Sequence, residues 1–290
     1  MGPKQSHLVT RWATDRPVDP DSSPFGLTGE GYKDFRGLPF AKLKALRGKA
    51  FVKCDLSHAD FCRTRIERLE FVDCRFAHVK FDGSVEQQSS FYGCVFSNCS
   101  FYRATLGVGT SNYDDCRFVE NDFSNPSISN AVFRRTEFAD NEMTNFFFNA
   151  TGFWSCKIRG RIESVEFLGN YQTESELVRY GPPINTGLHN VDLCNSVLRM
   201  VSFRNHCAIE DTALPKDGSS SLVDSEALLA HAPEFKRRFP EHADKIENYL
   251  KIFISPSDQP VTICNLSDLC EVVDNEVGNR IFVEIKQLKP

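Results

Sequence analysis

The chain has 290 residues and a formal net charge of −5, so it can bury a sizeable core and lacks the basic excess of a general nucleic-acid binder. No apolar run approaches the roughly 18 residues of a membrane span, and no apolar stretch follows a basic start, so we expect neither a membrane segment nor a secretory signal. The 11 cysteines, in a chain of this size, favour free thiols in a reducing, cytoplasmic setting over a disulfide scaffold.

Residues 1–48 lack the pattern that dominates the middle of the chain. Pro17, Pro20 and Pro24 predict an extended segment. The stretch 38–46 is typical of a short amphipathic helix. We expect this helix to cap the first open end of the repeat that follows, because a terminal unit otherwise exposes core and unpaired backbone.

From position 49 the sequence advances in steps of five, with a bulky apolar residue at the centre of nearly every step. The residue two places before each centre is small, and the residues around it are mostly polar. A period of five is neither the 3.6 of a helix nor the two of a flat strand, and it fits a chain that bends every five residues. The centres are Phe51, Leu56, Phe61, Ile66, Phe71, Phe76, Phe81, Phe91, Phe96, Phe101, Leu106, Phe118, Phe123, Ile128, Phe133, Phe138, Met143, Phe148, Phe153 and Ile158.

Four such steps close a turn of about twenty residues, so residues twenty apart should stack in columns. Stacked rings should lie roughly 4.8 Å apart, and each offset pair adds about 0.5–1.5 kcal/mol. Parallel cysteines on adjacent turns have poor disulfide geometry, so we expect them to fill the small inward site as compact apolar groups. The predicted structural core consists of Phe71, Phe76, Phe91, Phe96, Phe118 and Phe138, with Cys54, Cys74 and Cys94 beside them.

Histidine and cysteine spacing predicts no metal site and no cofactor. The chain has no C-x-x-C pair, and Cys264 and Cys270 are too far apart for a zinc knuckle. His58 and His78 are twenty apart and should stack on an outer face, next to Asn98. A metal-binding or pH-sensing pair is one interpretation, and a coincidence of surface positions is the one we favour.

Three interruptions break the repeat. Glu86 occupies a centre position, and the stretch 107–115 shifts the register by two residues, which predicts a β-bulge or small loop. The longest interruption, 168–190, predicts a projecting loop. Loops on rigid scaffolds often carry function, although solenoids also tolerate neutral insertions. The candidate partner-binding residues in it are Tyr171, Glu174, Glu176, Arg179 and Tyr180.

The beginning of the last eighty residues predicts a linker and two short helices. Residues 216–221 are typical of a linker, and Asp224 or Ser225 can cap a helix after it. Pro233 should open a second helix that ends before Pro240.

The rest of this segment completes a small α+β module. We expect a helix over 241–254, a strand over 261–264, and a second strand over 281–285, where apolar and polar residues alternate. The region 266–273 fits either helix or strand. Such a module could cap the repeat, pair two copies into a homodimer, or bind a partner.

No catalytic motif is present. The sequence has no P-loop, no dinucleotide-binding glycine fingerprint, no G-x-S-x-G and no H-E-x-x-H. The many carboxylates are explained by their place in the repeat, whose interior should be filled with side chains. We therefore predict that the protein is not an enzyme, with the C-terminal module as the one place where activity stays open.

The units Cys54-Asp55-Leu56-Ser57-His58 and Ala59-Asp60-Phe61-Cys62-Arg63 resemble the A-[DN]-[LF]-x-x motif of the pentapeptide-repeat family. This pattern recurs along roughly half of the chain and leaves out both ends. The resemblance implies a mainly β fold, a right-handed quadrilateral β-helix. Its expected parts are an N-terminal extension and cap (1–48), the β-helix with its inserted loop (49–210), and the α+β module (211–290).

The resemblance also implies a function, since some members of the family mimic DNA and protect type II topoisomerases such as gyrase. Mimicry of about one charge per 1.7 Å needs a strongly acidic face. Positions 49–210 hold 20 acidic and 17 basic residues, so the acids would have to gather on one side. The longer C-terminal module, in place of the family's usual pairing helix, also weakens this alternative.

We therefore favour a non-enzymatic scaffold that presents its loop and C-terminal module to a protein partner, in a target-protection or immunity role. Topoisomerase protection by DNA mimicry is the alternative, and an enzymatic C-terminal module is the weaker one. Direct nucleic-acid binding and membrane attachment are not expected.

Overall fold

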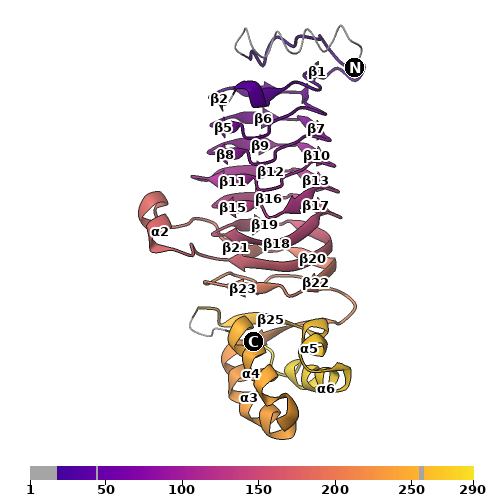
Figure 1. Ribbon diagram of the computed structural model, residues 1–290, viewed down its shortest axis with the longest axis vertical. Coiled ribbons are helices and arrows are strands. Elements are labelled where there is room, and N and C mark those ends of the chain that lie inside the picture. The colour runs from indigo at the N-terminus through magenta and orange to yellow at the C-terminus, as the bar shows by residue number, and fades with distance from the viewer. Residues whose placement is uncertain (1–17, 44, 255–257) are drawn as a thin grey trace.

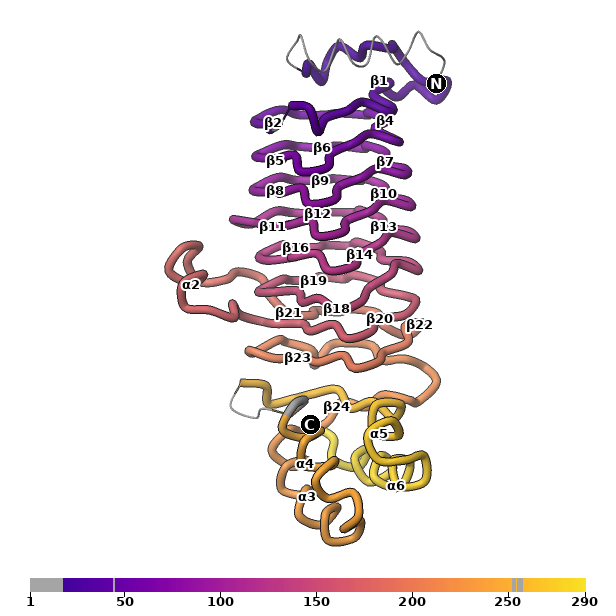
Figure 2. Tube along the Cα trace, viewed as in Figure 1, coloured from indigo at the N-terminus to yellow at the C-terminus, as the bar shows by residue number. Residues whose placement is uncertain are grey.

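The repeat folds as a stack of parallel strands in the computed structural model, which describes residues 18–43, 45–254 and 258–290. The chain winds along the long axis and ends in a group of helices (Figure 1, Figure 2). Phe51 pairs with Phe71 and Phe71 with Phe91, so successive turns are in register at the spacing of the repeat. The predicted mainly β solenoid is confirmed. The expectation for Pro17 lies outside the described residues.

The described strands fall into four columns, because each turn carries four apolar centres. One column is a separate seven-stranded parallel sheet. It consists of β3 (Ala50–Val52), β6 (Glu70–Val72), β9 (Ser90–Tyr92), β12 (Ser111–Asp114), β16 (Ala131–Arg134), β19 (Gly152–Trp154) and β21 (Gly187–His189).

The other columns join into one 16-stranded sheet. They join because β18 (Glu142–Asn149) and β20 (Lys157–Leu168) continue around corners from one column into the next. One column consists of β1 (Lys33–Asp34), β4 (Cys54–Asp55), β7 (Arg75–Ala77), β10 (Val95–Ser97), β13 (Arg117–Val119), β17 (Glu137–Ala139), the start of β20, and β22 (Asp192–Arg199).

The remaining two columns complete each turn. One begins as isolated bridges that link Asp60, Lys80, Ser100 and Asp122, and continues as β14 (Asp122–Ser124) and the start of β18. The other, which we call the groove column, consists of β2 (Ala45–Arg47), β5 (Arg65–Glu67), β8 (Val85–Gln87), β11 (Thr105–Val108), β15 (Ser127–Ser129), the ends of β18 and β20, and β23 (Ser202–Arg204).

Stacked aromatic rings fill the interior. The ring centroids of Phe76 and Phe96 lie 4.6 Å apart, and those of Phe96 and Phe118 also lie 4.6 Å apart. Each ring therefore sits one strand spacing from the next and removes apolar area from water. The residues buried in this way include Phe71, Phe76, Phe91, Phe96, Phe118 and Phe138.

The small inward position beside these rings holds a column of buried cysteines that includes Cys54, Cys74 and Cys94. The Cys74 thiol donates to the carbonyl oxygen of Phe51 at 3.2 Å, and the Cys94 thiol donates to that of Phe71 at 3.4 Å. Every cysteine of the chain is free. The thiols thus act as compact side chains, each of which donates a weak hydrogen bond to a backbone carbonyl of the neighbouring turn.

The N-terminal segment differs from its prediction, because it adds a turn to the solenoid. β1 pairs with β4 and β2 pairs with β5, both in parallel. Phe35 and Phe40 are buried and five residues apart, and Phe40 stacks on Phe61 at 4.4 Å. The expected helix over 38–46 is correspondingly shorter: a 3₁₀ helix, η1 (Phe40–Leu43), gives way to β2.

The C-terminal part combines a two-stranded antiparallel sheet with helices. In the described ranges, none of the helices of the chain has both the length and the apolarity needed to span a membrane. The elements of this part are β24 (Ser220–Asp224), α3 (Ser225–Arg238), η2 (Pro240–His242), α4 (Ala243–Phe253), β25 (Val261–Asn265), α5 (Leu266–Val272) and α6 (Asn275–Ile285).

Several expectations for this part are confirmed. Asp224 is the N-cap of α3, where its carboxylate accepts a hydrogen bond from the Ala227 amide at 2.7 Å. The predicted helix at 241–254 corresponds to α4, and the predicted strand at 261–264 to β25. The region 266–273, which fitted helix or strand, forms α5.

Three other expectations are wrong. The proposed strand over 281–285 is the end of α6, because Val277, Ile281 and Ile285 are buried at a spacing of four while Val283 is 56% exposed. Pro233 lies inside α3 instead of opening a helix. The supposed linker runs into β24, which is the true partner of β25.

The C-terminal part covers the last turn of the solenoid. Val261 and Ile263 of β25 belong to the solenoid core. The Gln259 side chain pairs with the backbone of Cys207, accepting from its amide at 2.8 Å and donating to its carbonyl at 2.6 Å. The Asp268 carboxylate accepts from the Met200 amide at 2.9 Å. Side chains thus satisfy backbone groups that another turn would otherwise pair.

Candidate functional site: a groove between two interruptions

The predicted bulge is confirmed in the groove column. Opposite β8, Thr105 pairs with Val85 but Val108 pairs with Gln87, so the register shifts within β11. Gly107 sits in this shift with a φ of +87°. A Cβ there would lie 2.6 Å from the Ser129 carbonyl oxygen, so only glycine fits.

Glu86, the polar residue at a centre position, lies beside the bulge, where the Gly107 amide donates to it. Its side chain is buried, and it accepts hydrogen bonds from the Ser111 hydroxyl at 2.6 Å and the Tyr113 hydroxyl at 3.0 Å. The amides of Gly107, at 2.8 Å, and Ser89, at 3.1 Å, donate to the same carboxylate. Burial raises the pKa of Glu86, and the four donors oppose that rise.

The second interruption leaves the sheet after Leu168 and returns at Gly187, the first residue of β21. The projecting loop is therefore shorter than the predicted 168–190, because Leu188 is buried opposite Phe153. The loop carries α2 (Glu174–Tyr180), which stands out from the side of the stack (Figure 1).

Asn149, at the end of β18, ties α2 to the solenoid. Its side-chain amide donates to the Glu176 carboxylate at 2.7 Å, and its carbonyl accepts from the Gln172 amide at 3.2 Å. Glu176 also closes a capping box with Thr173, which satisfies the first turn of the helix. A seven-residue helix is too short to be stable alone, so these bonds hold its position.

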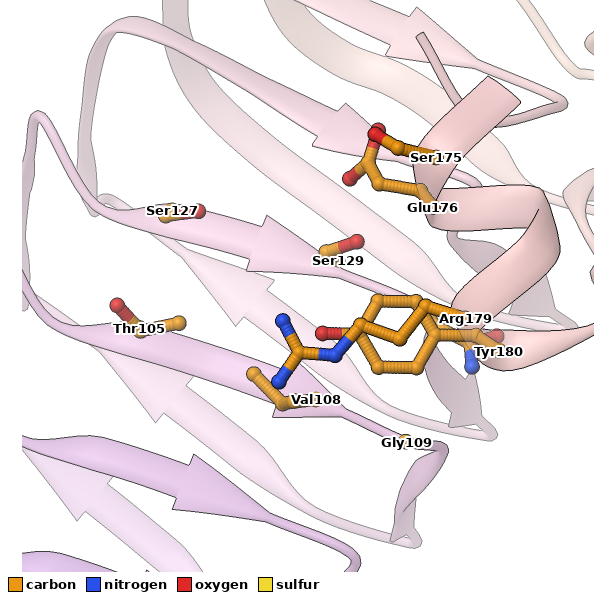
Figure 3. Close-up of a pocket in the computed structure, with 10 residues that line it drawn as sticks. Thr105, Val108, Gly109, Ser127, Ser129, Ser175, Glu176, Arg179 and Tyr180 are labelled. Carbon is orange, nitrogen blue, oxygen red and sulfur yellow. The ribbon is translucent and has the colours of Figure 1, made fainter. Parts of the chain in front are cut away.

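The two interruptions meet at one groove of about 330 Å³ (Figure 3). Its floor comes from β11 with its bulge and from β15, and its wall comes from α2. Both strands lie more than forty residues before α2 in the sequence, and the winding of the solenoid brings them together. The lining residues are Thr105, Val108, Gly109, Ser127, Ser129, Asn130, Ser175, Glu176, Arg179 and Tyr180.

Of the five loop residues singled out from the sequence, Glu176, Arg179 and Tyr180 line the groove. Tyr171 is buried at the base of the loop, where its ring centroid lies 6.0 Å from that of Tyr180. Glu174 is exposed in the first turn of α2 and does not line the groove.

Sequence reasoning missed the floor of the groove. Thr105, Ser127 and Ser129 are short polar residues at outward positions of the repeat. Residues of this kind occur throughout the solenoid, so nothing local marks these three. The register shift beside Thr105 was the one available signal.

The outer side of the loop exposes apolar residues. Val178 is 80% exposed, Ile184 is 64% exposed and Leu177 is 40% exposed. An anchored helix that leaves such side chains in water is typical of a protein contact surface.

Charges on the solenoid alternate between turns. Arg117 pairs with Glu137 at 3.1 Å, and Arg135 pairs with Asp115 at 2.9 Å, in each case across adjacent turns. Glu137 and Asp115 are thus each compensated by an arginine one turn away. Exposed pairs of this kind contribute little stability, but they leave a mixed surface.

The predicted histidine pair stacks on the outer face. His58 and His78 are exposed, and their ring centroids lie 5.0 Å apart. Within the described part of the chain, no three potential ligands among His, Cys, Asp and Glu are grouped as a metal ion would require.

No protein-family model matches the chain, and neither does any curated protein sequence. Among solved structures, the chain is similar to QnrB1, described as a plasmid-mediated fluoroquinolone resistance protein. A trypsin-treated form of QnrB1 is 12% identical, with a TM-score of 0.30 over 56% of this chain and 78% of that chain. Full-length QnrB1 is 15% identical, with a TM-score of 0.24 over 56% and 94%. These TM-scores are too low to add to the fold, which rests on the strand pairing.

Proposed function

We propose that the protein is a non-enzymatic scaffold whose right-handed quadrilateral β-helix presents the α2 loop and its groove to a protein partner. The observation that carries this proposal is the meeting of the two interruptions on one face. A neutral insertion would need neither the anchor at Asn149 nor a bulge beneath it. The filled interior of the solenoid favours binding over catalysis.

The exposed apolar residues of the loop indicate the contact. Val178 and Ile184 lie on a segment whose other side is fixed by Asn149, so a partner would meet a surface that is already ordered. Preorganisation lowers the entropic cost of association. The free cysteines fit the reducing cytoplasm in which we place this interaction, in a target-protection or immunity role.

The charge pattern favours this scaffold over DNA mimicry. A mimic of duplex DNA needs uncompensated acids along one face. Here Glu137 contacts both Arg117 and Arg159, and Asp115 contacts Arg135.

The proposal is tested by capture of the partner from the protein's own cells. We expect the wild-type protein to retain a specific protein that the double variant V178D/I184D loses. V283D is the matched control, because Val283 is also more than half exposed but lies on α6. Equal capture by the double variant would contradict a role for the loop, and circular dichroism should show that all variants are folded.

A further inference from the structure

The groove under α2 contains more hydrogen-bond donors than acceptors. Its one carboxylate, Glu176, is already engaged by Asn149 at 2.7 Å and by the Thr173 hydroxyl at 2.9 Å. The Ser129 hydroxyl oxygen accepts from the Asn149 amide at 3.3 Å, which leaves its own proton free to donate. The hydroxyls of Thr105 and Ser127 have no hydrogen-bond partner within the described residues.

Arg179 supplies a positive charge above these donors. Its guanidinium carbon lies 5.1 Å from the centre of the Tyr180 ring, and no carboxylate among the described residues pairs with it. Figure 3 shows the guanidinium reaching from α2 over β11, on the side of the sheet where Thr105 and Ser129 project. Arg117 and Arg135, by contrast, are occupied by carboxylates.

The surrounding strands carry no opposing charge. The outward positions of the groove column at this level are Val85, Gln87, Thr105, Val108 and Ser127, all of them uncharged. The cation therefore faces uncharged strands, and the one carboxylate of the groove, Glu176, is already engaged by Asn149 and Thr173. A guanidinium binds a carboxylate through two parallel hydrogen bonds, and such charge-assisted bonds are stronger than neutral ones.

We propose that this groove binds an aspartate or glutamate side chain of an acidic peptide segment, with Arg179 as its counter-charge and the hydroxyls of Thr105, Ser127 and Ser129 as further donors. The inference rests on the proposed function and names the partner chemistry at the same loop. One free arginine fits one carboxylate, whereas a polyanionic nucleic acid needs a basic surface that this chain of net charge −5 lacks.

The test uses fluorescein-labelled hexaglutamate and hexaglutamine with the full chain, measured by fluorescence polarisation at low salt. We expect hexaglutamate to bind at least tenfold more tightly than hexaglutamine. R179Q should lose about tenfold in affinity for hexaglutamate, and S127A/S129A about threefold. R103Q is the matched control, since Arg103 is likewise exposed beside a tyrosine ring, and it should bind as the wild type does.

Three outcomes would overturn the inference. These are no binding of hexaglutamate to the wild type, equal binding by R179Q, and tighter binding of a hexapeptide that carries phosphoserine, which would assign the groove to a phosphate group. Capture from cells separates this inference from the proposed function. If V178D/I184D loses the partner while R179Q keeps it, the loop binds protein without using the groove for a carboxylate.

Discussion

The solenoid and the C-terminal part are stabilised in different ways. In the solenoid, residues of the same type stack on one another in successive turns, so Phe76 contacts Phe96 and Cys74 lies over Cys54. The C-terminal helices pack dissimilar side chains around a second core that includes Phe235 and Phe282. The core of the solenoid continues from each turn into the next, whereas the core of the C-terminal part is confined to its own helices and strands.

The two regions also meet their irregularities differently. A polar group inside the solenoid must be satisfied by the neighbouring turns, as Glu86 is by Ser111 and Tyr113. At the junction, polar side chains such as Gln259 take the place of a missing strand. Substitutions in the stacked core should therefore affect the unfolding of the whole solenoid, whereas substitutions at the junction or the loop should have smaller, local effects.

The largest effect should follow from F76D. Phe76 is buried between Phe96 and its other neighbours, so an aspartate there buries an unpaired charge between turns. We expect a loss of about 5 kcal/mol or more in the free energy of unfolding, enough to abolish the cooperative transition. Thermal unfolding followed by circular dichroism measures it.

V52D is the control for F76D, because Val52 is exposed on β3 of the same solenoid. Its melting temperature should stay close to that of the wild type. An unchanged melting temperature for F76D would show that the column is not stacked as described.

The next largest effect should come from E86L. Leucine fits the apolar column but leaves the hydroxyls of Ser111 and Tyr113 and the Gly107 amide without their acceptor. At about 1–3 kcal/mol for each unsatisfied buried donor, we expect a loss of at least 3 kcal/mol. Urea unfolding gives the value.

The triple variant E86L/S111A/Y113F sharpens this test. It removes two of the orphaned donors together with their acceptor, so it should recover part of the stability that E86L loses. If the triple variant were less stable than E86L, the network would not be what holds the bulge.

The junction predicts a pH dependence. Burial raises the pKa of Asp268 to about 6, against about 3.9 in the unfolded chain. The folded state therefore binds this proton more tightly, so the contribution of Asp268 is full below about pH 4 and is lost as the pH rises through about 6. Urea unfolding of wild type and D268N from pH 4 to pH 7 should show this decline only in the wild type. D244N, on the exposed side of α4, should show the same decline in stability as the wild type. If D268N also showed the decline, Asp268 would not be its source.

The columns of the solenoid could be predicted because every inward position recurs and each recurrence confirms the last. The turn that contains Phe35 and Phe40 escaped, since a single step of five is too short to be recognised as a period. The strand expected around Ile281 failed because alternation over five residues also occurs by chance on a helix. This segment does not repeat, so no second copy of the pattern could decide between helix and strand.

The candidate site was predictable only by half. The projecting loop declares itself by breaking the repeat, and three of its five candidate residues line the groove. The floor of the groove depends on the winding of the chain, because Thr105 and Ser127 line it only once α2, which begins at Glu174, lies beside them. The spacing of the repeat does not show on which face of the solenoid the bulge and the loop lie, so their proximity could not be predicted.

The smallest effect should follow from N149A. The substitution removes the contacts of Asn149 to Glu176 and Gln172 but leaves the stacked core intact, so the free energy of unfolding should change by about 1 kcal/mol. α2 should nevertheless loosen, because a helix of this length depends on its anchor. Trypsin should then cleave after Arg179 several-fold faster than in the wild type. S127A, which removes a hydroxyl from the same column at a residue that does not contact Asn149, should be cleaved at the wild-type rate. Equal cleavage of N149A and S127A would mean that α2 is held by something other than Asn149.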